Sequence, residues 1–222
     1  MIECVVFDLD NTLYDYDYCN ELAIESLAGF ACKRFDIARN CFDAAFNRAR
    51  TRVKEQLGEV GASHNRMLYM QTFLEEIGHN PVQGALELYD VYWEKMLEKM
   101  RLFEYVTPLM VELQKRRVKI GVLTDLTTHI QHRKIIKLGI DGYVDVLVTS
   151  EEAGQEKPSI KIFDLMIKKT GLRPEDMLMV GDSQVKDIEG AVSAGMKGYL
   201  FDKNTDRNVC ADILELLNDG MD

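Results

Sequence analysis

Five short apolar runs, separated by stretches with helical spacing, limit most strongly what this chain can fold into. The runs cover residues 2–8, 118–124, 144–149, 177–181 and 198–201. A short, continuous apolar run is typical of a parallel strand that is buried on both faces of its sheet. Alternation of such strands with helices predicts an α/β domain built on a parallel sheet.

Cap residues mark helix boundaries between these runs. Thr107-Pro108 has the pattern of an N-cap followed by proline at the first helical position, and Ser159 stands where the helix after Lys157-Pro158 is expected to start. Gly139 and Gly171 stand where a helix commonly ends on a left-handed glycine.

The stretch from residue 15 to residue 101 has a different pattern, with apolar residues at helical spacing and no convincing strand. The first set is Phe42, Phe46, Ala49, Val53 and Leu57; the second is Met67, Met70, Phe73, Leu74 and Ile77; the third is Val82, Ala85, Tyr89, Tyr92, Trp93, Met96 and Met100. We therefore expect an all-helical insert over 15–101, which interrupts an α/β domain formed by 1–14 and 102–222.

Composition excludes several classes of protein. The 222 residues are 46% hydrophobic and 29% charged, as in an ordinary globular chain. The net charge of −10 argues against binding a nucleic acid polymer or an anionic membrane, since both need positive surface. No apolar run approaches the ~18–20 residues that span a bilayer. Five cysteines without paired spacing, and a start without a signal-peptide pattern, predict a cytoplasmic protein without disulfides or a zinc site.

Polar residues gather where the predicted strands and loops end. They are Asp8 and Asp10 after the first run, Thr124 and Asp125 after the second, Lys157 before a helix, and Asp182 and Asp187 after the fourth. The carboxyl ends of parallel strands meet in one crevice, where ligands bind. Carboxylates collected there suit Mg²⁺, which usually holds a substrate phosphate, while a hydroxyl and an ammonium suit the other phosphate oxygens.

Each of these residues also has a structural interpretation. The segment from Asp8 to Thr12 could merely close a strand, Thr124 and Ser183 could cap helices, and Lys157 could be a solvated loop lysine. Their joint occurrence in chain order, each at the right end of a strand or loop, favours a ligand site.

Together these residues resemble the four motifs of the haloacid dehalogenase-like (HAD) hydrolase superfamily. The motifs are Asp8-Leu9-Asp10-Asn11-Thr12, then Thr124, then Lys157, then Gly181-Asp182-Ser183 with Asp187. The helical insert after the first motif is similar to the small helical cap of that superfamily. The resemblance implies a Rossmann-like parallel sheet core with an inserted all-helical cap domain.

The resemblance also implies a role for each motif residue. Asp8 is expected to be the nucleophile and Asp10 the general acid and base. Thr124, Lys157 and the backbone at Asp125 are expected to bind phosphate. Mg²⁺ is expected to be held by Asp8, the Asp10 carbonyl, Asp182 and Asp187. Many relatives have asparagine where this chain has Asp125, whose side chain we expect to point away from the phosphate and cap the next helix.

The motif set favours a Mg²⁺-dependent phosphatase that acts on a small nucleotide or sugar phosphate. Halide-removing relatives lack the second aspartate of the first motif and the metal-binding aspartate of the fourth. A phosphomutase shares all four motifs and stays an alternative, as does a non-catalytic regulatory module that binds phosphate or metal. The sequence leaves the physiological substrate and the oligomeric state open.

The expected cap supplies candidates for substrate selection. Residues 33–66 hold eight Lys/Arg against four Asp/Glu, a local charge of +4. Arg48 and Arg52 are four residues apart and share a helix face, while His64 and Arg66 follow the break at Gly61. These residues either attract an anionic substrate or form a solvated helix face and a helix start.

Overall fold

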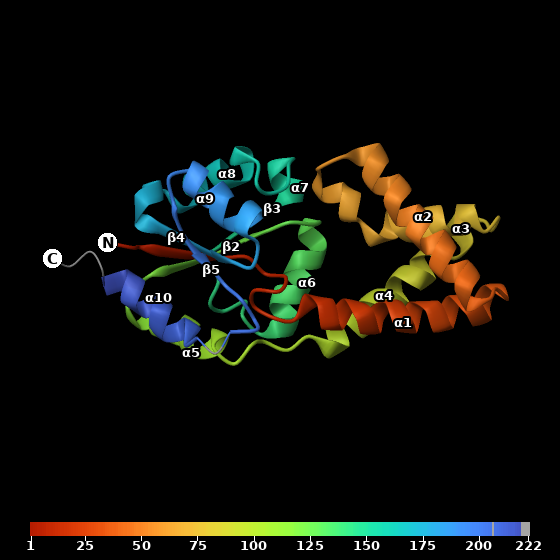
Figure 1. Cartoon of the computed structure of the whole chain (residues 1–222), viewed down its shortest axis with the longest axis horizontal. Helices are drawn as coiled ribbons and strands as arrows, with labels where there is room; N and C mark the ends of the chain where they lie inside the picture. Colours follow the sequence, from red (N-terminus) through yellow and green to blue (C-terminus); the bar gives the residue numbers. More distant parts are fainter. Residues whose placement is uncertain (206, 219–222) are drawn as a thin grey trace. The chain divides into compact units, whose positions relative to one another are not determined.

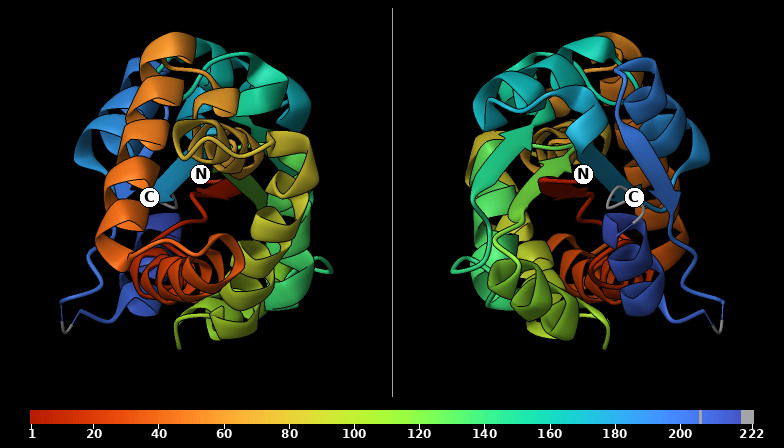
Figure 2. Two further views of the ribbon diagram at one scale, coloured as in Figure 1. Left: turned by 90° about the vertical axis from the view of Figure 1, so that its right-hand side faces the viewer. Right: turned by 90° about the vertical axis from the view of Figure 1, so that its left-hand side faces the viewer.

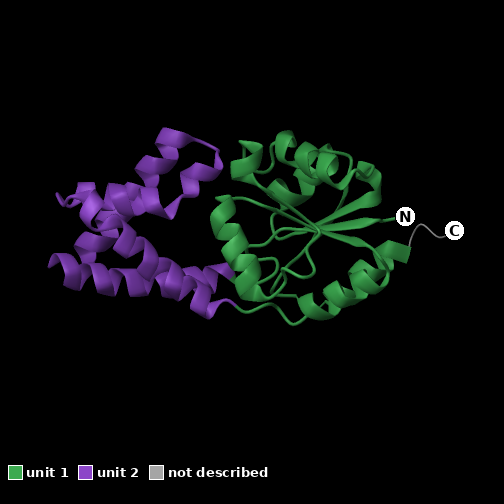
Figure 3. Cartoon of the chain, turned by 180° about the vertical axis from the view of Figure 1, so that it is seen from behind, with its two compact units in different colours: residues 1–15, 101–222 green, residues 16–100 purple. Residues whose placement is uncertain are grey.

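The computed structural model describes residues 1–205 and 207–218. Two compact units make up the chain. The first, here the core unit, consists of residues 1–15 and 101–222, and the second, here the helical unit, of residues 16–100 (Figure 3).

The core unit is built on a parallel sheet with strand order β3-β2-β1-β4-β5 (Figure 1). The strands are β1 (Cys4–Phe7), β2 (Lys119–Thr124), β3 (Val146–Thr149), β4 (Met177–Gly181) and β5 (Lys197–Leu200). Each of the five predicted runs coincides with a strand to within a few residues, and the α/β parallel-sheet prediction is confirmed.

Burial follows the position of each strand in the sheet. Every residue of β1 and β4 is buried, as a continuous apolar run predicts for central parallel strands. The prediction of a strand buried on both faces is wrong for β5, which is mostly exposed. It lies at the edge of the sheet and has β4 as its only strand neighbour in the described sheet, so less of it is covered.

Helices cover both faces of this sheet. They are α5 (Val106–Lys115), α6 (Thr128–Leu138), α7 (Ser150–Ala153), α8 (Ile160–Thr170), α9 (Gly190–Ser193) and α10 (Val209–Asn218), with single 3-10 and π turns at Pro174–Asp176 and Gln184–Glu189. Helices α8 and α9 lie on one face, and α5 and α10 lie together on the other (Figures 1 and 2). Side chains of α8, including Phe163 and Met166, fill the space against Val6 and Leu123 of the sheet.

Most helix boundaries follow the cap residues. Ser159 caps α8 by accepting from the Lys161 N–H, and both Gly139 and Gly171 end their helices in the left-handed conformation. The prediction that Thr107 caps α5 is wrong, because this helix begins at Val106. Pro108 is the third helical residue, and it is tolerated there because N–H groups of the first turn have no partner inside the helix.

Four helices form the helical unit: α1 (Tyr16–Phe35), α2 (Arg39–Leu57), α3 (Arg66–Glu76) and α4 (Ala85–Lys99), with 3-10 turns at Gly61–His64 and Pro81–Gln83. Helix α1 packs on α4, and α2 on α3. The rings of Phe42, Phe46 and Phe73 meet at 5.2–6.1 Å between centroids. Val82 was predicted in the apolar stripe of α4 but lies in the 3-10 turn, 90% exposed. Among the described residues, no helix is apolar over enough length to cross a bilayer.

Candidate active site

Asp8 lies directly after β1, at the carboxyl edge of the sheet. Its backbone N–H donates to the Val180 carbonyl at 2.9 Å, which continues the pairing of β1 with β4. Its carboxylate accepts from the Lys157 ammonium at 2.6 Å and from the Thr12 hydroxyl at 3.3 Å. The residue is 5% exposed, so a fixed and nearly dry carboxylate stands at the strand end.

Lys157 joins three elements at this edge. Its ammonium donates to the carboxylates of Asp8 and Asp187, each at 2.6 Å, and to the Leu123 carbonyl at 3.2 Å. The side chain is buried, so the interpretation of Lys157 as a solvated loop lysine is wrong.

The turn after β4 holds Asp187 against the strand. The Ser183 N–H donates to Asp187 Oδ2 at 3.0 Å, and the Ser183 hydroxyl accepts from the Lys186 N–H. A Cβ at Gly181 would overlap the Asp187 carboxylate, so only glycine at this place allows Asp187 to approach the strand.

Carboxylate oxygens of Asp8, Asp182 and Asp187 lie within 4.8 Å of one another. Burial raises the pKa of the Asp8 carboxyl well above its usual range, by more than Lys157 lowers it. Burial and then Asp187 raise the pKa of Asp182. Three carboxylates around one ammonium leave excess negative charge. The donor set therefore fits a small divalent cation with oxygen ligands.

Lys157 is charged despite its burial. Burial by itself lowers the pKa of a lysine, but here Asp187, Asp8 and Asp125 outweigh that effect and raise the pKa of Lys157 well above its usual value. The site thus contains a permanent cation beside Asp8, which is the arrangement that an anionic ligand needs.

The side chain of Asp10 is turned to partners outside the four motifs. Its carboxylate accepts from the Lys134 ammonium at 2.7 and 2.8 Å and from the Tyr14 hydroxyl at 2.7 Å. The Asp10 carboxylate does not belong to the cluster formed by the carboxylates of Asp8, Asp182 and Asp187. Sequence reasoning missed Lys134, although its place between Ile130 and Leu138 put a lysine on the apolar face of α6.

Thr124 and Asp125 follow β2 and are held by hydrogen bonds. The Gln131 amide donates to the Thr124 hydroxyl at 2.7 Å. The Asp125 carboxylate accepts from the Lys157 N–H and from the Lys186 ammonium, each at 3.0 Å. The prediction that Asp125 caps the next helix is wrong, since Thr127 holds the N-cap position of α6. Lys186, which the sequence did not single out, balances the charge of Asp125.

In the helical unit, Arg48 and Arg52 both face Glu76, at 3.0 and 3.5 Å. The unit as a whole has ten Lys/Arg against thirteen Asp/Glu, so the local excess of +4 does not make it positive. Glutamates outside the counted window pair with arginines inside it. The solvated-face interpretation therefore fits Arg48 and Arg52.

Arg66 is buried instead, and its guanidinium donates to the His64 carbonyl at 2.6 Å and to the hydroxyls of Tyr16 and Tyr92. It also lies over the rings of Tyr92 and Trp93. The structure thus separates the four candidates into a surface pair, Arg48 and Arg52, and a second pair in which Arg66 is buried and His64 is half-buried.

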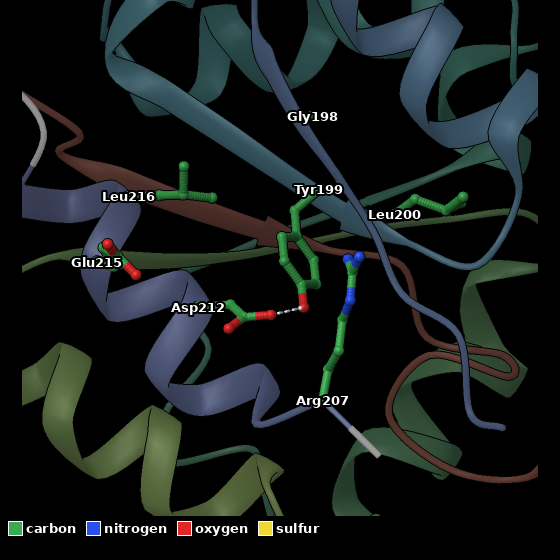
Figure 4. A pocket seen from close by; sticks show the side chains of 7 residues that line it. All are labelled: Gly198, Tyr199, Leu200, Arg207, Asp212, Glu215 and Leu216. Atoms are coloured by element: carbon green, nitrogen blue, oxygen red, sulfur yellow. Dashed lines mark hydrogen bonds between the residues drawn. The ribbon is translucent and has the colours of Figure 1, made fainter. Parts of the chain in front are cut away.

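A hollow of about 410 Å³ lies elsewhere in the core unit, between β5 and α10 (Figure 4). Its lining includes Arg207 and the Tyr199 hydroxyl, which donates to Asp212 at 2.9 Å. None of the residues predicted from the motifs lines this hollow.

The model of the haloacid dehalogenase-like hydrolases matches residues 2–195. The chain belongs to this family. It is 40% identical over 204 residues to ribulose-1,5-bisphosphate 5-phosphatase of Halopiger xanaduensis, covering 91% of this chain and 85% of the relative. It is 33% identical over 208 residues to glyceraldehyde 3-phosphate phosphatase of Methanothermobacter thermautotrophicus, covering 90% and 85%.

Solved structures of HAD hydrolases share the fold. The HAD hydrolase YfnB of Bacillus subtilis, solved with bound magnesium, has a TM-score of 0.71 and 20% identity over 98% of this chain and 99% of its own. Family and relatives make the chain an enzyme, a phosphoric monoester hydrolase of the HAD family. The resemblance stated from the motifs is confirmed.

Proposed function

We propose that this HAD hydrolase cleaves a small sugar phosphate monoester in the presence of Mg²⁺, through an aspartyl-phosphate on Asp8. The observation that carries the proposal is the setting of Asp8, a buried carboxylate 2.6 Å from the Lys157 ammonium and clustered with Asp182 and Asp187. Relatives named for a sugar bisphosphate and for a triose phosphate support the substrate class.

Asp8, Asp182 and Asp187 would hold the Mg²⁺ with their carboxylates, and Asp10 with its backbone carbonyl. When bound, Mg²⁺ offsets the repulsion between the Asp8 carboxylate and the phosphate. The excess of carboxylates over ammonium groups in this cluster supports that assignment.

In the first step, an Asp8 oxygen forms a bond to phosphorus while the bond from phosphorus to the sugar oxygen breaks. Asp10 gives its proton to the departing oxygen, so that an alcohol leaves. In the second step, Asp10 takes a proton from water, whose oxygen attacks phosphorus. The Asp8–phosphorus bond breaks, inorganic phosphate leaves, and both aspartates return to their starting state.

Three groups would hold the phosphate during both steps. Lys157 supplies a positive charge, Thr124 a hydroxyl and Asp125 a backbone N–H. Gln131 orients the Thr124 hydroxyl, and Lys186 balances the Asp125 side chain, so that each group is fixed before substrate arrives.

We assign substrate selection to the helical unit as a cap. Arg66 is its main candidate because it is buried and charged, and its guanidinium donates to two phenol hydroxyls and a backbone carbonyl. The His64 carbonyl accepts from Arg66, whereas Arg48 and Arg52 share the single carboxylate of Glu76. The partner of the enzyme is then a small phosphorylated metabolite.

A phosphate-release panel tests this proposal. It compares ribulose 1,5-bisphosphate, glyceraldehyde 3-phosphate, a hexose phosphate and a nucleoside monophosphate, each with Mg²⁺ and with EDTA. The proposed function predicts Mg²⁺-dependent release that is fastest with the sugar phosphates, and none from Asp8→Asn. Phosphate moved between hydroxyls of one sugar without release would instead identify a phosphomutase. Release that EDTA does not change would contradict the metal assignment.

A further inference from the structure

The Asp10 carboxylate is bound on both oxygens by two buried side chains that no HAD motif includes. The Lys134 ammonium lies 2.7 Å from Oδ1 and 2.8 Å from Oδ2, and the Tyr14 hydroxyl lies 2.7 Å from Oδ1. The side chain of Lys134 is fully buried, while that of Asp10 is 28% exposed. Lys134 and Tyr14 thus hold the Asp10 carboxylate, and its exposed part stays accessible to a ligand.

A lysine at this place is costly for the fold. Position 134 lies on the apolar face of α6 in line with Ile130 and Leu138, where leucine or methionine would pack without desolvating a charge. The contact with Asp10, and the Tyr14 ring 5.9 Å from the ammonium, offset that cost. A buried charge that contacts a proposed catalytic carboxylate suggests a role in the reaction.

The backbone around Asp10 is fixed from the other side. Asp10 and Tyr14 form a bridge, and Tyr14 forms another with Leu102. The Phe103 N–H donates to the Leu13 carbonyl at 2.9 Å, and the Tyr105 hydroxyl to the Thr12 carbonyl at 2.5 Å. These contacts hold the backbone of the loop, but they do not restrict rotation of the Asp10 side chain. The hydrogen bonds from Lys134 and Tyr14 restrict that rotation.

We propose that Lys134, with Tyr14, is a positioning residue that fixes the Asp10 carboxylate in the orientation for proton transfer to the departing sugar oxygen. This rests on the proposed role of Asp10 as general acid and base. Proton transfer needs the donor within hydrogen-bond reach of the reacting oxygen, so a carboxylate free to rotate loses rate without losing substrate affinity.

Lys134→Met tests the inference, because methionine fills a similar volume without the charge. The substrates are a sugar phosphate, whose alkoxide needs a proton, and p-nitrophenyl phosphate, whose leaving group hardly does. We expect kcat for the sugar phosphate to fall about 10- to 100-fold, within the range of general acid catalysis. The rate of the first p-nitrophenol burst and the KM for the sugar phosphate should each change less than about threefold.

Two further variants separate positioning from folding. Tyr14→Phe keeps the ring and removes one hydrogen bond, so the sugar phosphate rate should fall several-fold with the burst again preserved. If Lys134→Met does not fold, Tyr14→Phe by itself tests whether the orientation of Asp10 matters for proton transfer. Lys169→Met removes a lysine whose partner, Glu152, lies outside the site, and it should leave both rates unchanged.

Asp10→Asn provides the coupling test. If Lys134 acts through Asp10, Lys134→Met in the Asp10→Asn background should not change the ratio of sugar phosphate rate to burst rate any further. Equal losses with both substrates, or a loss that adds fully to that of Asp10→Asn, would overturn the inference. If the wild-type chain released no phosphate at all, the proposed function would fail instead, and the two failures are thereby distinguished.

Discussion

The buried charge cluster of the core unit and the exposed ion pairs of the helical unit place charged side chains in opposite environments. In the core unit, Asp8, Lys157 and Asp187 are buried in mutual contact at one edge of the sheet. In the helical unit, arginines such as Arg39 and Arg48 meet glutamates and aspartates on the exposed surface. Arg66 is the exception, because it is buried among aromatic rings.

This difference shows which charges carry information about function. Exposed pairs are screened by solvent and contribute little, so a count of them in the sequence says little about a site. A buried cluster with unequal numbers of acids and bases costs stability, and a bound cation or anion recovers it. Burial rather than the number of charges therefore identifies the site in this chain.

The largest expected effect comes from a matched pair of carboxylates, one from each unit. Asp8→Asn removes the proposed nucleophile and should lower kcat at least about a thousandfold, while thermal unfolding still shows a folded chain. Glu76→Gln removes a half-buried carboxylate of the helical unit that pairs with surface arginines, and it should change kcat less than about twofold. Similar losses in both variants would abolish the distinction between the two units.

Removal of divalent metal should come next in size. EDTA should reduce phosphate release to a few per cent or less, and excess Mg²⁺ should restore it, because the three core carboxylates otherwise repel the substrate. Thermal unfolding in Mg²⁺ and in EDTA provides a second readout: the melting temperature should rise with Mg²⁺. The Asp187→Asn variant should lose that rise. An unchanged rise in this variant would place the metal elsewhere.

Breaking the ion pair between Asp125 and Lys186 should lower activity less, and a second substitution should reverse the loss. Lys186→Met leaves the Asp125 carboxylate without the ammonium 3.0 Å away, so kcat/KM should fall about tenfold as negative charge remains beside the phosphate site. Asp125→Asn in the same chain should restore most of the loss. A double variant no better than Lys186→Met would show that Lys186 does not act by balancing Asp125.

Arg48 and Arg52 should give the smallest effect. Replacing both with glutamine removes two surface charges that pair with Glu76, and kcat/KM should stay within about twofold at low and at high salt. Electrostatic steering by these arginines, the other interpretation of the sequence, predicts a clear fall that is larger at low salt. Such a fall would show that surface charge on the helical unit attracts the substrate.

The sequence was sufficient for the fold class and for the motif residues at the strand ends, because parallel strands bring their carboxyl ends to one edge. It could not reveal the partners of Asp10 and Asp125. Lys134 and Lys186 come from a helix face and a turn, and their contacts depend on how α6 and the Gln184–Glu189 turn pack. The local excess of +4 could not choose between substrate steering and a solvated face, because the sequence does not show that Glu76 and Glu87, outside the counted window, fold back onto Arg48 and Arg34.

The central claim is that Asp8 becomes phosphorylated and Asp10 moves the protons. The most direct measurement is rapid mixing of Asp10→Asn with p-nitrophenyl phosphate, followed by acid quenching and mass spectrometry of peptides. Transfer should still occur, since this leaving group hardly needs a proton, but hydrolysis should stall without a base. We predict a p-nitrophenol burst of at most about one equivalent and a hydroxylamine-labile phosphate on Asp8. No burst with no trapped phosphate, or a phosphate on another residue, would contradict the claim.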